Sequence, residues 1–108
     1  MSYTDWNGTM ITITAIIRAK SGQESALRAA LLSVEADTVA NEPETLGFHV
    51  SQSMDDAALF TTYERFANVA AKDRHNGSDA VARFFALAPT LIEGDVVLHT
   101  CREVSDNG

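Results

Sequence analysis

Apolar residues recur along this chain with two different spacings, which separate expected strands from expected helices. A strand alternates its side chains between two faces, whereas an amphipathic helix repeats its apolar positions every three or four residues. The alternating pattern occupies residues 9–19, 46–53, 58–65 and 93–104. In the first of these segments threonine alternates with isoleucine, and such β-branched residues favour a pleated strand.

Helical spacing first appears between residues 23 and 39. The positions on its apolar stripe are Leu27, Leu31, Val34 and Thr38. The segment S-G-Q-E at 21–24 has the pattern of a capping box, in which Ser21 and Glu24 satisfy free amide groups at the helix start. Pro43 disfavours helical geometry at the residue before it and ends the helix.

A second helical region runs from residue 66 to residue 91 and is interrupted in the middle. Residues 66–75 are rich in alanine, and Asn76-Gly77 then supplies residues that tolerate the left-handed conformation at a helix end. Another helix starts at Ser78 or Asp79, and Pro89 should bend or end it. Its apolar stripe consists of Val81, Phe84, Phe85, Ala88 and Leu91.

The predicted order is β-α-β-β-α-β over residues 9–104, which indicates an α+β, ferredoxin-like domain with a four-stranded antiparallel sheet. Residues 1–8 are expected to form a flexible N-terminal arm, and residues 105–108 a polar tail. Helices can cover only one face of such a sheet, although its strands carry apolar residues on both faces. We therefore expect a homodimer that forms through the sheets.

Composition excludes several classes of protein. The 108 residues suffice for one domain, and 45% apolar with 21% charged residues is ordinary for a globular protein. A net charge of −7 makes nucleic acid and anionic membranes unexpected partners. The longest apolar run, within residues 10–17, is too short to span a bilayer. The single cysteine, Cys101, is expected to be a buried hydrophobe, and no secretion signal is recognisable, so we expect a cytoplasmic location.

Three short motifs, in their order and spacing, point to a known family. Glu42-Pro43 is followed by T-L-G-F at 45–48, Y-E-R-F lies at 63–66, and His75 and Ser78 stand ahead of Phe84. From residue 9 to residue 104 the chain resembles the antibiotic biosynthesis monooxygenase family, whose members are dimeric α+β barrels and include quinol monooxygenases. The resemblance implies a cofactor-independent monooxygenase that acts on a small quinol or polyphenol.

Three positions depart from the family pattern. Glu44 stands where the family usually has glycine, so the local turn must be made differently. Phe66 stands where the family often has tryptophan and therefore lacks an indole donor. His75 and Phe85 lie where the haem-degrading branch of the family has tryptophan and histidine, which argues against haem cleavage.

An oxygenase normally needs a metal or a flavin, because molecular oxygen reacts slowly with closed-shell organic molecules. The sequence has no pattern typical of a metal site or a flavin site. His49, His75 and His99 are widely separated, and no glycine-rich dinucleotide loop occurs. A quinol that loses a proton becomes an anion able to pass an electron to oxygen. We therefore expect no metal and no cofactor, and molecular oxygen as the second substrate.

His75 and Glu64 are the candidate catalytic residues. Imidazole titrates near neutral pH, so His75, at the end of an alanine-rich helix, is the candidate base for a substrate hydroxyl. The alternative is an exposed or C-capping histidine that interacts with the helix dipole. Glu64 shares a strand face with Phe60, and it either holds His75 or an arginine such as Arg18 in place or forms a structural ion pair.

Five phenylalanines are candidate walls for a flat aromatic substrate: Phe48, Phe60, Phe66, Phe84 and Phe85. Because aromatic residues at strand and helix spacing usually form plain core, we expect about two or three of them to line a pocket. Arg83 is a further candidate for substrate binding. Tyr63 alternates onto the face opposite Glu64 and is expected nearer the dimer contact.

Two other functions remain open from the sequence. The same scaffold could host isomerisation of a small carbonyl compound by acid-base transfer through His75 and Glu64. It could also bind a small aromatic molecule without turnover, or serve as a dimerisation module. Because one fold carries many functions, the fold alone does not decide among them.

Overall fold

The structure, a computed structural model, describes residues 9–105 of the chain. Its elements, in chain order, are β1 (Ile11–Arg18), α1 (Glu24–Asn41), β2 (Thr45–Gln52), β3 (Leu59–Phe66), α2 (Val69–Asn76), α3 (Asp79–Leu91) and β4 (Val97–Arg102). The predicted order is confirmed, with the second helical region divided into α2 and α3. The predicted arm at 1–8 and the tail residues 106–108 lie outside the described residues.

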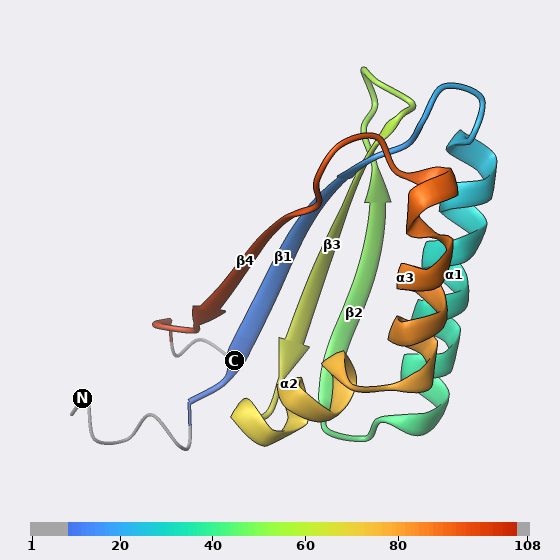
Figure 1. Ribbon diagram of the computed structural model, residues 1–108. Helices are drawn as coiled ribbons and strands as arrows, with labels where there is room; N and C mark the ends of the chain where they lie inside the picture. Colours follow the sequence, from blue (N-terminus) through green and yellow to red (C-terminus); the bar gives the residue numbers. More distant parts are fainter. Residues whose placement is uncertain (1–8, 106–108) are drawn as a thin grey trace.

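The four strands form one antiparallel sheet in the order β2-β3-β1-β4. Helices α1 and α3 lie side by side over one face of this sheet, and β4 forms the edge opposite β2 (Figure 1). This arrangement confirms the predicted α+β, ferredoxin-like fold. None of the helices within residues 9–105 has the length and apolar character needed to cross a bilayer.

Alternation along β1 explains which face of the sheet is buried. Its inward residues, which face the helices, are Ile11, Ile13, Ala15 and Ile17. The predicted apolar stripe of α1 packs against this face, and Leu27 and Leu31 are both buried in it. Burying one such aliphatic side chain stabilises the folded state by about 1.5–3 kcal/mol. The helices are thus held over the sheet mainly by apolar burial.

The start of α1 differs from the prediction. The helix begins at Glu24 with Gln23 as its N-cap and without a side-chain cap, so the predicted capping box on Ser21 is wrong. Gly22 has a φ angle of 83°, a left-handed conformation that turns the chain tightly and moves the helix start past Ser21. The Glu24 carboxylate still accepts a hydrogen bond of 3.2 Å from the Gly22 amide.

Two boundaries in the second helical region also differ. Phe66 is the last residue of β3, because its fully buried side chain continues the inward alternation of that strand, and α2 begins only at Val69 after the N-cap Asn68. Pro89 does not end α3, which continues to Leu91. Since Pro89 lies in the last turn, its missing amide costs one intrahelical hydrogen bond, while Leu91 anchors the helix end in the core.

The outer face of the sheet, turned away from the helices, is formed by alternate residues of all four strands. Tyr63 lies on it, as predicted, opposite His49 of β2. Ile16 and Val97 are neighbours on this face and are 38% and 45% exposed. Cys101 is exposed as well, so its prediction as a buried hydrophobe is wrong, because no element within residues 9–105 covers this side of β4.

Candidate active site

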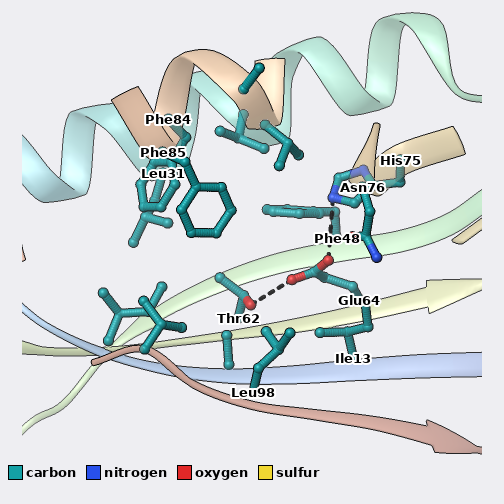
Figure 2. A pocket seen from close by; sticks show the side chains of 16 residues that line it. Ile13, Leu31, Phe48, Thr62, Glu64, His75, Asn76, Phe84, Phe85 and Leu98 are labelled. Atoms are coloured by element: carbon teal, nitrogen blue, oxygen red, sulfur yellow. Dashed lines mark hydrogen bonds and ion pairs between the residues drawn. The ribbon is translucent and has the colours of Figure 1, made fainter. Parts of the chain in front are cut away.

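A cavity of about 270 Å³ lies between the sheet and helices α1 and α3. Its walls are mostly apolar, and its few polar groups gather at one end, as Figure 2 shows. The polar groups belong to Thr62, Glu64, His75 and Asn76. Ligand pockets commonly have volumes of about 300–1,000 Å³, and this cavity, slightly below that range, suits only a small molecule.

Side chains from α1, from α3 and from the sheet form the apolar end of the cavity. Leu31 of α1 and the adjacent Phe84 and Phe85 of α3 lie across the cavity from Leu98 of β4, whereas Ile13 of β1 lies beside Glu64 (Figure 2). Phe85 is 54% exposed and Leu98 is 53% exposed, whereas the other three are buried. The cavity therefore opens to solvent between α3 and β4.

Glu64 brings a carboxylate to the polar end from β3. Strand alternation places it on the inner face beside Thr62, where it is 6% exposed. Thr62 Oγ1 donates a hydrogen bond of 2.7 Å to Glu64 Oε2, and His75 Nε2 lies 3.3 Å from Glu64 Oε1. Glu64 thus pairs with His75 and not with Arg18, which pairs with Asp56.

His75 is held at this point by the short helix α2. Asn68 caps the helix, and its side chain accepts a hydrogen bond of 2.9 Å from the Ala71 amide. Ala71 and His75 are four residues apart and share the buried face of the helix. The imidazole is 2% exposed and lies against Phe48 and Phe66, whose ring centroids are 5.4 and 5.3 Å away. His75 is therefore not the exposed histidine of the alternative interpretation.

A second carboxylate reaches His75 from the opposite side of the ring. Glu42 follows α1, and its Oε1 lies 2.9 Å from His75 Nδ1. The same oxygen accepts a hydrogen bond of 2.8 Å from Thr45 Oγ1. The turn that presents Glu42 is closed by the Thr45 amide, which donates to the Glu42 carbonyl. Glu44, in this turn, keeps a negative φ angle and pairs with Arg74, so glycine is not needed there.

Both ring nitrogens of His75 consequently face carboxylate oxygens. A carboxylate only accepts hydrogen bonds, whereas a neutral imidazole has one donor nitrogen and one acceptor nitrogen. Only the imidazolium donates on both sides. Burial by itself lowers the pKa of His75, but the hydrogen bonds and charges of Glu64 and Glu42 raise it more, so the pKa of His75 lies above its ordinary value.

The same geometry is unsuited to a metal ion. The carboxylates of Glu42 and Glu64 approach opposite nitrogens of His75, so one ion could not contact all three side chains. Across residues 9–105, no group of three His, Cys, Asp or Glu side chains is placed to hold a metal.

Some of the predicted substrate-binding residues lie at the cavity. Three of the five phenylalanines line it: Phe48, Phe84 and Phe85. Phe60 and Phe66 are fully buried in the packed core and do not line it, because their rings fill the space between sheet and helices. Arg83 lies beside Phe84 in sequence, but the helical turn points it outward, where its guanidinium lies 3.9 Å from Asp37. The prediction of substrate contact for Phe60, Phe66 and Arg83 is therefore not supported by their positions.

Sequence reasoning missed three polar residues near the cavity. Thr62 could have been found, because the alternation that directs Glu64 inward directs Thr62 inward as well. Glu42 belongs to a motif that carries the family resemblance, but nothing local shows that it reaches His75. Asn76 was expected only as the end of a helix, and it also contributes to the cavity wall.

Comparison with known protein families matches residues 10–87 to the family described as antibiotic biosynthesis monooxygenase. The comparison with curated proteins found no match. The matched segment contains both catalytic candidates, Glu64 and His75, as well as Glu42.

Solved structures of bacterial proteins have the same fold. Protein SO0527 from Shewanella oneidensis is 31% identical with a TM-score of 0.83, over 90% of this chain and 93% of its own. PA3566 from Pseudomonas aeruginosa is 25% identical with a TM-score of 0.82, over 92% and 98%. Rv0793 from Mycobacterium tuberculosis is 21% identical with a TM-score of 0.84, over 92% and 99%, and this likeness concerns the fold alone. Because the family match spans residues 10–87, this chain belongs to the antibiotic biosynthesis monooxygenase family.

Proposed function

We propose that this chain is a cofactor-independent monooxygenase that hydroxylates a small quinol or polyphenol. The observation that carries the proposal is the pairing of Glu64 with His75 at the polar end of an otherwise apolar cavity. Family membership supports oxygen chemistry, and the cavity volume supports a small aromatic substrate. Phe48, Phe84 and Phe85 provide aromatic walls for such a ring.

In this proposal Glu64 is the base, a role first expected of His75. An imidazolium has no lone pair in the ring plane with which to accept a proton. Glu64 can accept two further hydrogen bonds, because each of its two oxygens has two acceptor positions and a single protein partner here, Thr62 or His75. The positive charge of His75 then stabilises the substrate anion that forms beside it.

The substrate supplies all of the electrons in the proposed reaction. Transfer of a hydroxyl proton to Glu64 leaves an electron-rich anion, which passes an electron to oxygen inside the apolar cavity. One oxygen atom replaces a ring hydrogen, the O–O bond breaks, and the second oxygen atom leaves as water. A quinol and one molecule of oxygen thus give a hydroxylated quinone and water, and no external reductant is consumed.

Oxygen uptake tests this proposal directly. With a panel of reduced naphthoquinones and polyphenols, we expect one molecule of oxygen consumed per substrate and one labelled atom from ¹⁸O₂ in the product. Glu64→Gln keeps the side-chain shape but removes the base, and we expect it to lower kcat by roughly 10²- to 10⁴-fold. Glu93→Gln, at an exposed position away from the cavity, is the control and should leave kcat unchanged.

Other outcomes would overturn the proposal. Substrate loss without oxygen uptake would instead indicate isomerisation through the same pair of residues. Thermal stabilisation by an aromatic ligand without any turnover would indicate a binding protein. Full activity of both Glu64→Gln and His75→Ala would remove the proposed chemical roles of the two residues.

We further propose that the chain acts as a homodimer joined through the outer faces of its sheets. The support comes from apolar side chains that the single chain leaves exposed on this face, including Ile16, Tyr63 and Val97. Helices cover only the other face of the sheet, so a second copy is the simplest cover for this one.

A further inference from the structure

Glu42 lies on the side of His75 that faces away from the cavity. It does not line the cavity that holds Glu64, but it does line a second hollow of about 300 Å³. That hollow lies between the end of α1, the start of β2 and helix α2, and its polar lining includes Asp37 and Arg74. The Glu42 side chain is 15% exposed there, whereas the His75 side chain is 3% exposed. His75 lines only the first cavity and Glu42 only the second hollow, and the imidazole has one carboxylate on each side.

The position of the Glu42 carboxylate is fixed by its surroundings. One oxygen, Oε1, receives the Thr45 hydroxyl at 2.8 Å and lies 2.9 Å from His75 Nδ1. The cation of the second hollow, Arg74, pairs with Glu44. Arg74 is thus paired with Glu44, and the charged partner of Glu42 is His75.

We propose that Glu42 is a positioning residue of the active site, which fixes the ring orientation and the positive charge of His75 beside Glu64, the proposed base. The chemical role of Glu64 in this statement rests on the proposed function. Glu42 itself does not contact the substrate, because it does not line the first cavity. The charged groups around His75 are Glu64 from β3 and, across the second hollow, Glu42, Asp37 and the Arg74–Glu44 pair.

The charge of Glu42 determines how tightly His75 holds its second proton. If Glu42 loses its charge, His75 holds its second proton less tightly and becomes neutral at lower pH. A neutral ring that still donates from Nδ1 turns the lone pair of Nε2 toward the Glu64 carboxylate, which is repulsive unless Glu64 takes up a proton. In both cases the imidazolium charge is lost from the site, and in the second case the carboxylate base is lost as well.

A pair of glutamine variants separates this role from general electrostatics. Glu42→Gln keeps an oxygen that accepts from Nδ1 and from Thr45, so it removes the charge and preserves the shape. Glu93→Gln removes an equal charge at an exposed position away from both hollows and is the matched control. The readout is the pH titration of the His75 ring resonances by NMR, which are assigned with His75→Gln and need neither substrate nor turnover.

We expect the His75 midpoint to move to lower pH in Glu42→Gln and to stay at the wild-type value in Glu93→Gln. In oxygen-uptake assays, kcat should fall by about tenfold or more in Glu42→Gln, since removing the orienting carboxylate of a catalytic triad costs at least this much. The alkaline limb of its pH profile should move in the same direction as the midpoint, and KM should change little. Glu42→Asp keeps the charge and should recover part of the lost kcat.

An unchanged midpoint in Glu42→Gln, or an equal shift in both variants, would overturn the proposal. If Glu42→Gln does not fold, Glu42→Asp decides the question, because its withdrawn carboxylate should still lower the midpoint relative to wild type. Absence of oxygen uptake by the wild-type protein would refute the proposed function alone, since the titration tests the Glu42–His75 link without turnover.

Discussion

An imidazole buried between two carboxylates makes the stability of the folded chain depend on pH. Although burial lowers the pKa of His75, Glu64 and Glu42 raise it more, so His75 binds its proton more tightly in the folded chain than in the unfolded one. Such a group stabilises the fold fully below its unfolded pKa of about 6.5, and its contribution is lost as the pH rises through the folded pKa. At the scale of a single residue, His75 thus links the chemistry of the site to folding.

We therefore predict that the free energy of unfolding declines as the pH rises above about 6.5. Urea unfolding at a series of pH values measures this decline. In His75→Gln this decline of the free energy of unfolding with pH should disappear, whatever the change in overall stability. In His49→Gln, which alters an exposed histidine of the outer face, it should remain as in wild type. Equal slopes in wild type and His75→Gln would contradict the prediction.

At the scale of an element, α3 uses two adjacent phenylalanines for different purposes. Successive residues of a helix are rotated by about 100°, so both cannot face the same way. Phe84 is buried in the core, whereas Phe85 is more than half exposed at the cavity mouth. Of the two rings in the predicted apolar stripe, only Phe84 is thus buried. The two rings meet edge to face with centroids 5.5 Å apart, which keeps Phe85 in place.

Truncation of the two rings should consequently affect different quantities. We expect Phe85→Ala to raise KM by about threefold to tenfold, the equivalent of one lost aromatic contact, with little change in kcat or stability. Phe84→Ala should instead lower the free energy of unfolding by about 3–5 kcal/mol. Leu87→Ala, also about half exposed on α3 but away from this cavity, is the control and should leave KM unchanged. An unchanged KM in Phe85→Ala would place the substrate elsewhere.

At the scale of the whole molecule, the proposed homodimer depends on the outer face of the sheet. Ile16 lies in β1, with Thr61 and Val97 beside it on the neighbouring strands. A lysine here would place a charge in the middle of the proposed contact, where it could not be solvated without separating the chains. The helical side of the molecule offers a comparable exposed aliphatic residue, Leu32 of α1.

We predict that the wild-type chain sediments as a dimer and that Ile16→Lys sediments as a monomer. Leu32→Lys should remain dimeric, because α1 lies on the other side of the sheet. Analytical ultracentrifugation of the three proteins at equal concentration measures the masses. A dimer that survives Ile16→Lys but is lost in Leu32→Lys would show that association uses the helices instead.

The sequence by itself determined the elements and their order, because alternation and helical spacing are local properties that a few neighbouring residues express. Two of its errors lie at element boundaries, one caused by a local turn and the other by a tertiary contact. The capping box at Ser21 failed because Gly22 turns the chain first, and Phe66 joined the strand because the core buries its ring. The sequence also placed Glu64 on the inner face, since strand alternation leaves no other choice once Phe60 is buried.

Only the tertiary structure decided which groups meet. Glu42 and His75 are 33 residues apart in the chain and belong to a turn and a helix that come together where the end of α1, the start of β2 and α2 line the second hollow. Their contact leaves both ring nitrogens of His75 facing carboxylates, which favours the charged imidazolium. Because an imidazolium cannot accept a proton, the proposed base is Glu64 and not His75. A local pattern can predict that a side chain points inward. Which partner it contacts there depends on how distant segments pack, and a local sequence pattern does not contain that information.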